Sequence, residues 1–191
     1  MKIFLLFILI FLFLSGCSKK DEKLKVTSIQ DTTIYNLINQ IIPTEPYAFR
    51  FNLYIDKVEM NFIDTITPHD IFWAFNKEDS AFAYQQFTTI DQFVLSGKYL
   101  NNKKIFLQDS IEYYKTDSGF WSRLDNEKLK RFYGDEGFCY FFKPIFSSDL
   151  STCIAMFGNY CGPKCAKDKG AIYKRQNGLW KIHLILHDGE S

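Results

Sequence analysis

Two cysteines near the C-terminus, Cys161 and Cys165, have the spacing that most directly suggests chemistry. They enclose Gly162-Pro163-Lys164, so three residues separate them, whereas the redox motif of thiol–disulfide exchange has two. Gly and Pro form tight turns, and a turn here can bring the two Cα atoms within the roughly 7 Å that a disulfide needs. We therefore expect a structural Cys161–Cys165 disulfide and not a redox-active pair.

The other cysteines of the C-terminal half, Cys139 and Cys153, are not expected to pair. A turn centred near residues 148–149 would place residue 139 opposite residue 158 or so, and not opposite residue 153. We expect both to be buried thiols or poorly placed partners. A four-cysteine zinc site needs two closely spaced pairs, and the sequence has one, so we predict no metal site.

The histidines and the clustered acids suggest no reaction. His69 stands alone, while His183 and His187 lie four apart on an expected strand, which separates them by about 13 Å and prevents a shared metal. Asp135 and Glu136 are adjacent between two glycines and are expected to be solvated, because glycosidase carboxylates are not defined by adjacency. The sequence contains no nucleophile elbow, phosphate loop or dinucleotide fingerprint. We predict no catalytic and no cofactor-binding residues, and not an enzyme.

The aromatic content is high, with 20 Phe, 11 Tyr and 3 Trp. Trp73, Trp121 and Trp180 could form a platform for a carbohydrate, but large aromatic side chains are more commonly core residues. Trp180 alternates with Ile182 and Leu184 along an expected strand, which favours the same interpretation. We therefore expect the tryptophans in the core.

The first sixteen residues predict where the protein resides. Lys2 precedes an unbroken apolar run over residues 3–14, which as a helix spans about 18 Å, well short of the roughly 30 Å bilayer core. This pattern is typical of a secretory signal. The sequence Leu14-Ser15-Gly16-Cys17 resembles the lipobox of bacterial lipoproteins. The resemblance implies cleavage before Cys17, a diacylglyceryl thioether on its sulfur and an acylated amino group.

The charged segment after the lipobox predicts a tether. Residues 17–27 are almost free of apolar side chains, so we expect them to be solvated and residues 28–191 to form one globular domain. Ser18 replaces the aspartate that favours inner-membrane retention in some Gram-negative bacteria. The run Lys19-Lys20-Asp21-Glu22 resembles the export tags of surface lipoproteins. These resemblances favour the outer membrane over the inner one, and they leave open whether the protein faces outward or inward there.

Hydrophobic periodicity predicts an α+β fold, with helices in the N-terminal two thirds packed on a C-terminal antiparallel meander. The helices expected cover residues 34–42, capped by Asp31 or Thr32, and three further segments at 69–76, 78–87 and 120–134. Strands are expected at residues 47–55, 138–143, 152–160, 170–175 and 179–186. The pair Asn177-Gly178 predicts a two-residue hairpin with Arg175 opposite Trp180.

Charge excludes one class of partner. The 191 residues carry 23 basic and 22 acidic side chains, a net charge of +1, which gives no electrostatic basis for binding nucleic acid. The expected partners are the membrane, through acyl chains on Cys17, and an envelope protein or glycan.

The C-terminal third, over roughly residues 137–185, carries a recurring pattern. It comprises Pro144-Ile145-Phe146-Ser147, Tyr160-Cys161-Gly162 with Cys165, and Asn177-Gly178 with Trp180. It resembles the end of small exported bacterial lipoproteins, although Ala166 replaces a frequent glycine, and it implies export without implying an activity. We therefore expect a lipid-anchored, non-catalytic binding or accessory module. The alternative is a small hydrolase acting on an envelope or extracellular polymer.

Overall fold

The computed structural model describes residues 29–58, 69, 73–107, 130–131, 134, 136–161 and 165–190. The predicted signal peptide, Cys17 and the tether lie outside these residues. So does most of the helix expected at residues 120–134, and so do residues 70–72 of the helix expected at 69–76, of which residues 69, 73 and 74 are helical. In the described part, no helix has the length and apolar character needed to cross a membrane.

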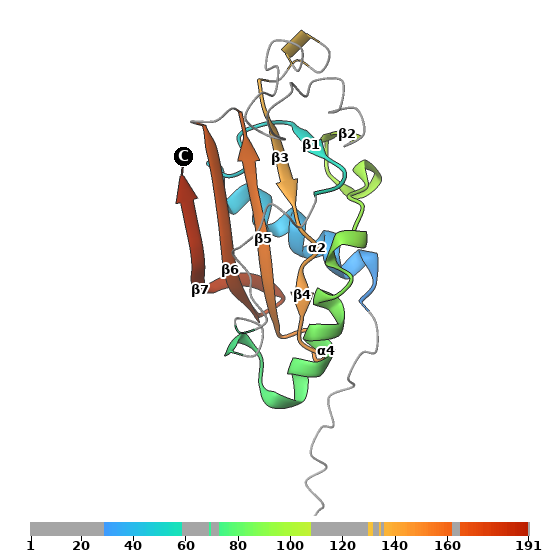
Figure 1. Cartoon of the computed structure of the whole chain (residues 1–191), viewed down its shortest axis with the longest axis vertical. Coiled ribbons are helices and arrows are strands. Elements are labelled where there is room, and N and C mark those ends of the chain that lie inside the picture. The colour runs from blue at the N-terminus through green and yellow to red at the C-terminus, as the bar shows by residue number, and fades with distance from the viewer. Residues whose placement is uncertain are drawn as a thin grey trace, which may run out of the picture.

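A sheet of seven strands dominates the described part, in the order β2-β1-β3-β5-β6-β7 with β4 paired to β5 (Figure 1). The predicted C-terminal meander is confirmed, because β3, β5, β6 and β7 are antiparallel neighbours. Their bounds are Phe138–Phe141 for β3, Ile145–Phe146 for β4, Thr152–Tyr160 for β5, Ala166–Gln176 for β6 and Leu179–Glu190 for β7. The ladder between β5 and β6 begins at Tyr160 and Ala166, so β6 starts four residues before the position expected from the sequence.

The strand expected over residues 47–55 is much shorter in the structure. β1 covers only Leu53–Ile55, and it lies inside the sheet between β3 and β2 (Lys104–Phe106), parallel to both. The preceding residues form a turn in which the backbone N–H groups of Ala48 and Phe49 donate to the carbonyl oxygen of Glu45. The alternating aromatic residues therefore belong to a packed turn and a short buried strand, and not to a long edge strand.

The hairpin between β6 and β7 is the turn that the sequence predicts. Asn177 and Gly178 have φ values of 52° and 81°, as a type I′ turn requires at both central positions. Gln176 lies opposite Leu179, and Arg175 lies opposite Trp180. The predicted register is therefore confirmed.

Two α-helices are described, α2 (Asp31–Ile41) and α4 (Lys77–Phe87). The predicted apolar stripe of α2 is buried, and Pro43 lies in the 3-10 turn η1 (Ile42–Thr44) that follows. The N-cap is Gln30, so the predicted capping by Asp31 or Thr32 is wrong. Asp31 is instead the first residue of the helix and lies in its first turn. Asn76 caps α4, because its side-chain oxygen accepts from the Asp79 N–H at 2.8 Å.

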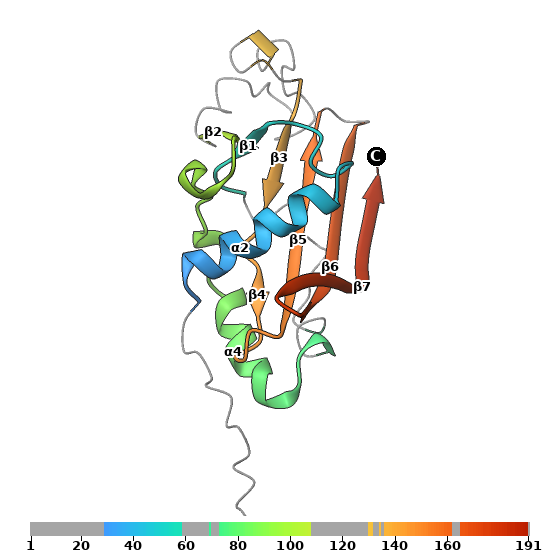
Figure 2. The same ribbon diagram turned by 180° about the vertical axis from the view of Figure 1, so that it is seen from behind.

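The core has two apolar clusters, one on each face of the sheet. Alternate residues of β5 belong to different clusters, with Ile154 in one and Ala155 in the other. Helix α2 covers the second face (Figure 2), while α4 lies beside β4, where the Gln86 side chain exchanges two hydrogen bonds with the Phe146 backbone. The fold has mixed α and β content. Where the sequence predicts three or more helices in residues 30–134, the described part has α2, α4 and the short turns η1, η3 (Ile90–Gln92) and η4 (Gly97–Tyr99).

Candidate binding site at the disulfide end of the sheet

The predicted disulfide joins the end of β5 to the start of β6. The Cα atoms of Cys161 and Cys165 are 5.2 Å apart, and their sulfurs are bonded. The Cys161 N–H donates to the Cys165 carbonyl at 3.0 Å, so the bridge closes a compact turn. Cys139 and Cys153 are buried thiols, as predicted, and burial raises the pKa of the Cys153 thiol.

Next to the disulfide, a row of directly opposed residues crosses four strands. Cys139 of β3 lies opposite Asn159 of β5, Asn159 lies opposite Lys167 of β6, and Lys167 lies opposite Glu190 of β7. Directly opposed residues point to the same face of a sheet. Exposure increases along the row, from buried Cys139 and Asn159 to partly exposed Lys167 and exposed Glu190. The row therefore leads from the core to the surface.

Residues 45–50, which we call the 45–50 loop, lie over this row and are fixed to it by Asn159. The Asn159 Nδ2 donates to the carbonyl oxygens of Tyr47 at 2.8 Å and Ala48 at 3.2 Å. Two carbonyl acceptors fix the orientation of the amide, since the opposite orientation would place oxygen against oxygen. Asn159 is only 1% exposed, and its Oδ1 has no hydrogen-bond partner among the described residues.

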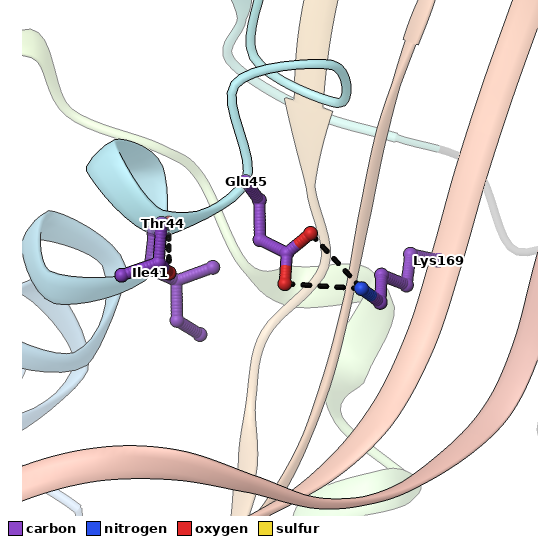
Figure 3. Close-up of polar contacts among 4 residues, drawn as sticks. All are labelled: Ile41, Thr44, Glu45 and Lys169. Atoms are coloured by element: carbon purple, nitrogen blue, oxygen red, sulfur yellow. Dashed lines mark hydrogen bonds and ion pairs between the residues drawn. The ribbon is translucent and has the colours of Figure 1, made fainter.

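An ion pair at the start of the same loop gives a second attachment (Figure 3). Both Glu45 carboxylate oxygens lie within hydrogen-bond distance of the Lys169 Nζ, at 3.0 and 2.9 Å, and the side chains are only 15% and 12% exposed. The preceding residue is held as well, because the Thr44 Oγ1 donates to the Ile41 carbonyl at 2.8 Å. The 45–50 loop is therefore attached to β6 at its first residue and to β5 at its middle.

Two cations beside the loop have no acidic partner within the described ranges. The Arg50 Nη2 lies against both disulfide sulfurs, at 2.6 Å from that of Cys165, and the guanidinium carbon lies 4.8 Å from the centre of the Phe51 ring. The Lys167 Nζ lies 5.7 Å from the centre of the Tyr47 ring. Tyr47 itself is 78% exposed, so most of its ring remains open to solvent.

These side chains surround a pocket of about 230 Å³. This volume is below the range of about 300–1,000 Å³ typical of sites for drug-sized ligands, so the pocket suits one small group of a larger partner. Its charged groups are two cations and a carboxylate, which together can bind an anion and neighbouring hydroxyl groups. The residues that line it are Tyr47, Arg50, Asn159, Cys165, Ala166, Lys167 and Glu190.

The histidines and acids considered from the sequence are not brought together here. His69 and His183 are exposed, and the His187 Nε2 lies 2.5 Å from the Asp168 carboxylate. Glu136 forms an exposed ion pair with Lys130, whereas Asp135 lies outside the described residues. No group of three potential metal ligands occurs in the part of the chain that the structure covers.

The tryptophans have different environments. Trp180 is 8% exposed and packs edge-on against Phe146, which confirms its predicted place in the core. Trp73 is 62% exposed, so the core prediction is wrong for this residue; Trp121 lies outside the described residues. Ile182 and Leu184 are also exposed, and β7 is the last strand of the sheet among the described residues.

Sequence reasoning missed the residues of the pocket. The sequence predicts a regular strand at Tyr47 and Arg50, and it predicts no strand at Lys167. Their partners are more than 100 residues away along the chain, as the contact between Asn159 and Tyr47 shows, and no local pattern reports such a distance. The expected disulfide was the only sequence signal that pointed to this end of the sheet.

Comparisons with protein-family models, curated proteins and solved structures find no match for this chain.

Proposed function

We propose that the chain is a lipid-anchored protein of the bacterial envelope whose domain is a non-catalytic binding module. The pocket at the disulfide end of the sheet is its binding site. The lipobox supports the anchor, and the pocket supports the binding role. The placement in the outer membrane rests on the sequence resemblances alone.

One observation carries the binding role. Within the described residues, Arg50 and Lys167 have no acidic partner, and they line the same pocket as the exposed Tyr47. Large exposed aromatic and arginine side chains are typical of recognition sites. The 45–50 loop is already fixed by the Asn159 and Lys169 contacts. The site is therefore preorganised, which reduces the entropy lost on binding.

The binding role is tested by cosedimentation of the mature full chain, in detergent, with purified extracellular and envelope polymer. We expect the wild type to sediment with the polymer and Lys167→Gln to remain largely in the supernatant. Lys174→Gln is the matched control, because it removes the same charge from an exposed position of β6 near the distant hairpin. Equal retention of all three proteins would contradict the proposed site.

The same incubation separates a binding module from the hydrolase alternative. We expect the polymer to keep its length, as measured by size-exclusion chromatography. Reproducible shortening that is lost in a pocket variant would overturn the proposal in favour of the hydrolase.

The anchor is tested separately. One acyl chain alone binds a membrane only marginally, whereas two or three chains on Cys17 give stable attachment. We expect an alkyne-bearing palmitate to label the wild-type chain in cells and not the Cys17→Ala variant. Equal labelling of the two would reject the anchor and leave the binding site untouched.

A further inference from the structure

We infer that the pocket binds an acidic sugar residue of a polysaccharide; this inference rests on the proposed function and specifies its ligand. Three kinds of group meet in the pocket: cations, hydrogen-bond acceptors and an open aromatic ring. Each restricts the chemistry of the ligand, and the three restrictions are independent.

The cations require a negative group. Arg50 and Lys167 line the same pocket, whose only acidic lining residue in the described part of the chain is Glu190, so the described lining side chains carry a net charge of about +1 at neutral pH. Guanidinium and ammonium groups form their strongest hydrogen bonds with carboxylate, phosphate or sulfate. The ligand therefore carries an anion in the pocket that these two side chains line.

The Glu190 carboxylate requires hydroxyl or N–H donors next to that anion, because an ionised carboxylate can only accept hydrogen bonds. Glu190 is exposed and lines the same pocket. A simple anion such as phosphate offers no apolar surface and few donors. A sugar acid offers a carboxylate together with several hydroxyl groups.

The ring requires an apolar surface. Tyr47 presents a 78% exposed ring at the rim of the pocket, and an amphipathic ring of this kind suits a ligand with an apolar face and polar edges. A pyranose has this form, with C–H groups on one face and hydroxyl groups at its edge. A nucleic acid would also supply anions and rings, but the chain's net charge of +1 gives no basis for binding one.

The inference is tested with matched pairs of saccharides that differ only at the carboxylate. The ligands are trigalacturonate, a hyaluronan tetrasaccharide and sialyllactose, each compared with its methyl ester. Binding of the mature full chain in detergent is measured by isothermal titration calorimetry. We expect at least one acid to bind about tenfold or more tightly than its ester, as the loss of a charge-assisted hydrogen bond predicts.

Variants locate the binding. We expect Lys167→Gln and Tyr47→Ala each to lower the affinity for the acidic saccharide by about tenfold, while Lys174→Gln changes this affinity by less than twofold. Esters that bind as tightly as the acids, or a Lys174→Gln loss as large as that of Lys167→Gln, would overturn the inference. If no acid binds but the polymer still sediments the wild type and not Lys167→Gln, the acidic-sugar inference fails and the proposed function stands.

Discussion

Among individual residues, the ion pair between Glu45 and Lys169 has the clearest energetic consequence. Both side chains are largely buried, and removal of one partner from such a pair leaves an uncompensated charge. We expect Lys169→Met to lower the free energy of unfolding by about 3 kcal/mol, measured by urea denaturation. The double variant Glu45→Gln/Lys169→Met should recover most of this loss, because no buried charge then remains.

The exposed pair between Lys130 and Glu136 is the matched control for this prediction. Its side chains are 64% and 62% exposed, and an ion pair that is exposed to water contributes little to stability. Lys130→Met should therefore leave the unfolding free energy nearly unchanged. A loss at Lys169 no larger than the loss at Lys130 would mean that the pair does not hold the 45–50 loop on the sheet.

At the scale of the elements, the β6–β7 hairpin is both predictable and testable. Gly178 has a φ of 81°, a conformation that a residue with a Cβ adopts only with strain. We expect Gly178→Ala to cost more than about 1 kcal/mol of unfolding free energy, measured by thermal or urea unfolding. Asn177→Gly introduces a residue that adopts a positive φ without strain, so its loss of unfolding free energy should be only a few tenths of the loss at Gly178. Equal losses in the two variants would argue against strain in the turn.

The elements that the sequence predicts correctly are those whose signals are local. The hairpin follows from Asn177-Gly178, α2 from its apolar stripe and Pro43, and the disulfide from Gly162-Pro163 between two cysteines. The parallel pairing of β1 with β2 and β3 has no local signal, because it joins residues about 50 and 85 positions apart. The same limit applies to the candidate site, since a loop near residue 47 and strands near residue 160 meet only in the folded chain.

The pocket also shows why local patterns misassign residues. Tyr47, Phe49 and Phe51 alternate as a half-buried strand would, yet Tyr47 is exposed in a turn while Phe49 is buried against Phe141 and Phe157. The structure does not keep this alternation in burial, because Tyr47 is exposed while Ala48 and Tyr54, which the pattern places on the opposite face, are buried. The turn therefore changes which side chains are buried as well as the backbone conformation, and neither followed from the sequence at this position.

For the molecule as a whole, burial of tyrosines predicts sensitivity to alkali. Desolvation by burial is the main cause of a raised pKa at Tyr35, Tyr54, Tyr140, Tyr160 and Tyr173, all above the ordinary value of 10.0. Above pH 10 the unfolded chain therefore releases phenol protons that the folded chain retains. The unfolded state then binds fewer protons, so the free energy of unfolding falls as pH rises.

Tyr173→Phe tests this account. Its hydroxyl is buried without a hydrogen-bond partner among the described residues, so its removal should leave stability at pH 7 unchanged or slightly higher. Above pH 10 the variant should lose stability less steeply than the wild type, by up to about 1.4 kcal/mol per pH unit, measured as urea midpoints along a pH series. Tyr47→Phe is the control: its ring is 78% exposed in the fold, so its hydroxyl meets water in both states and the wild-type slope should persist. A Tyr173→Phe slope identical to that of the wild type would show that this buried phenol does not contribute to alkaline unfolding.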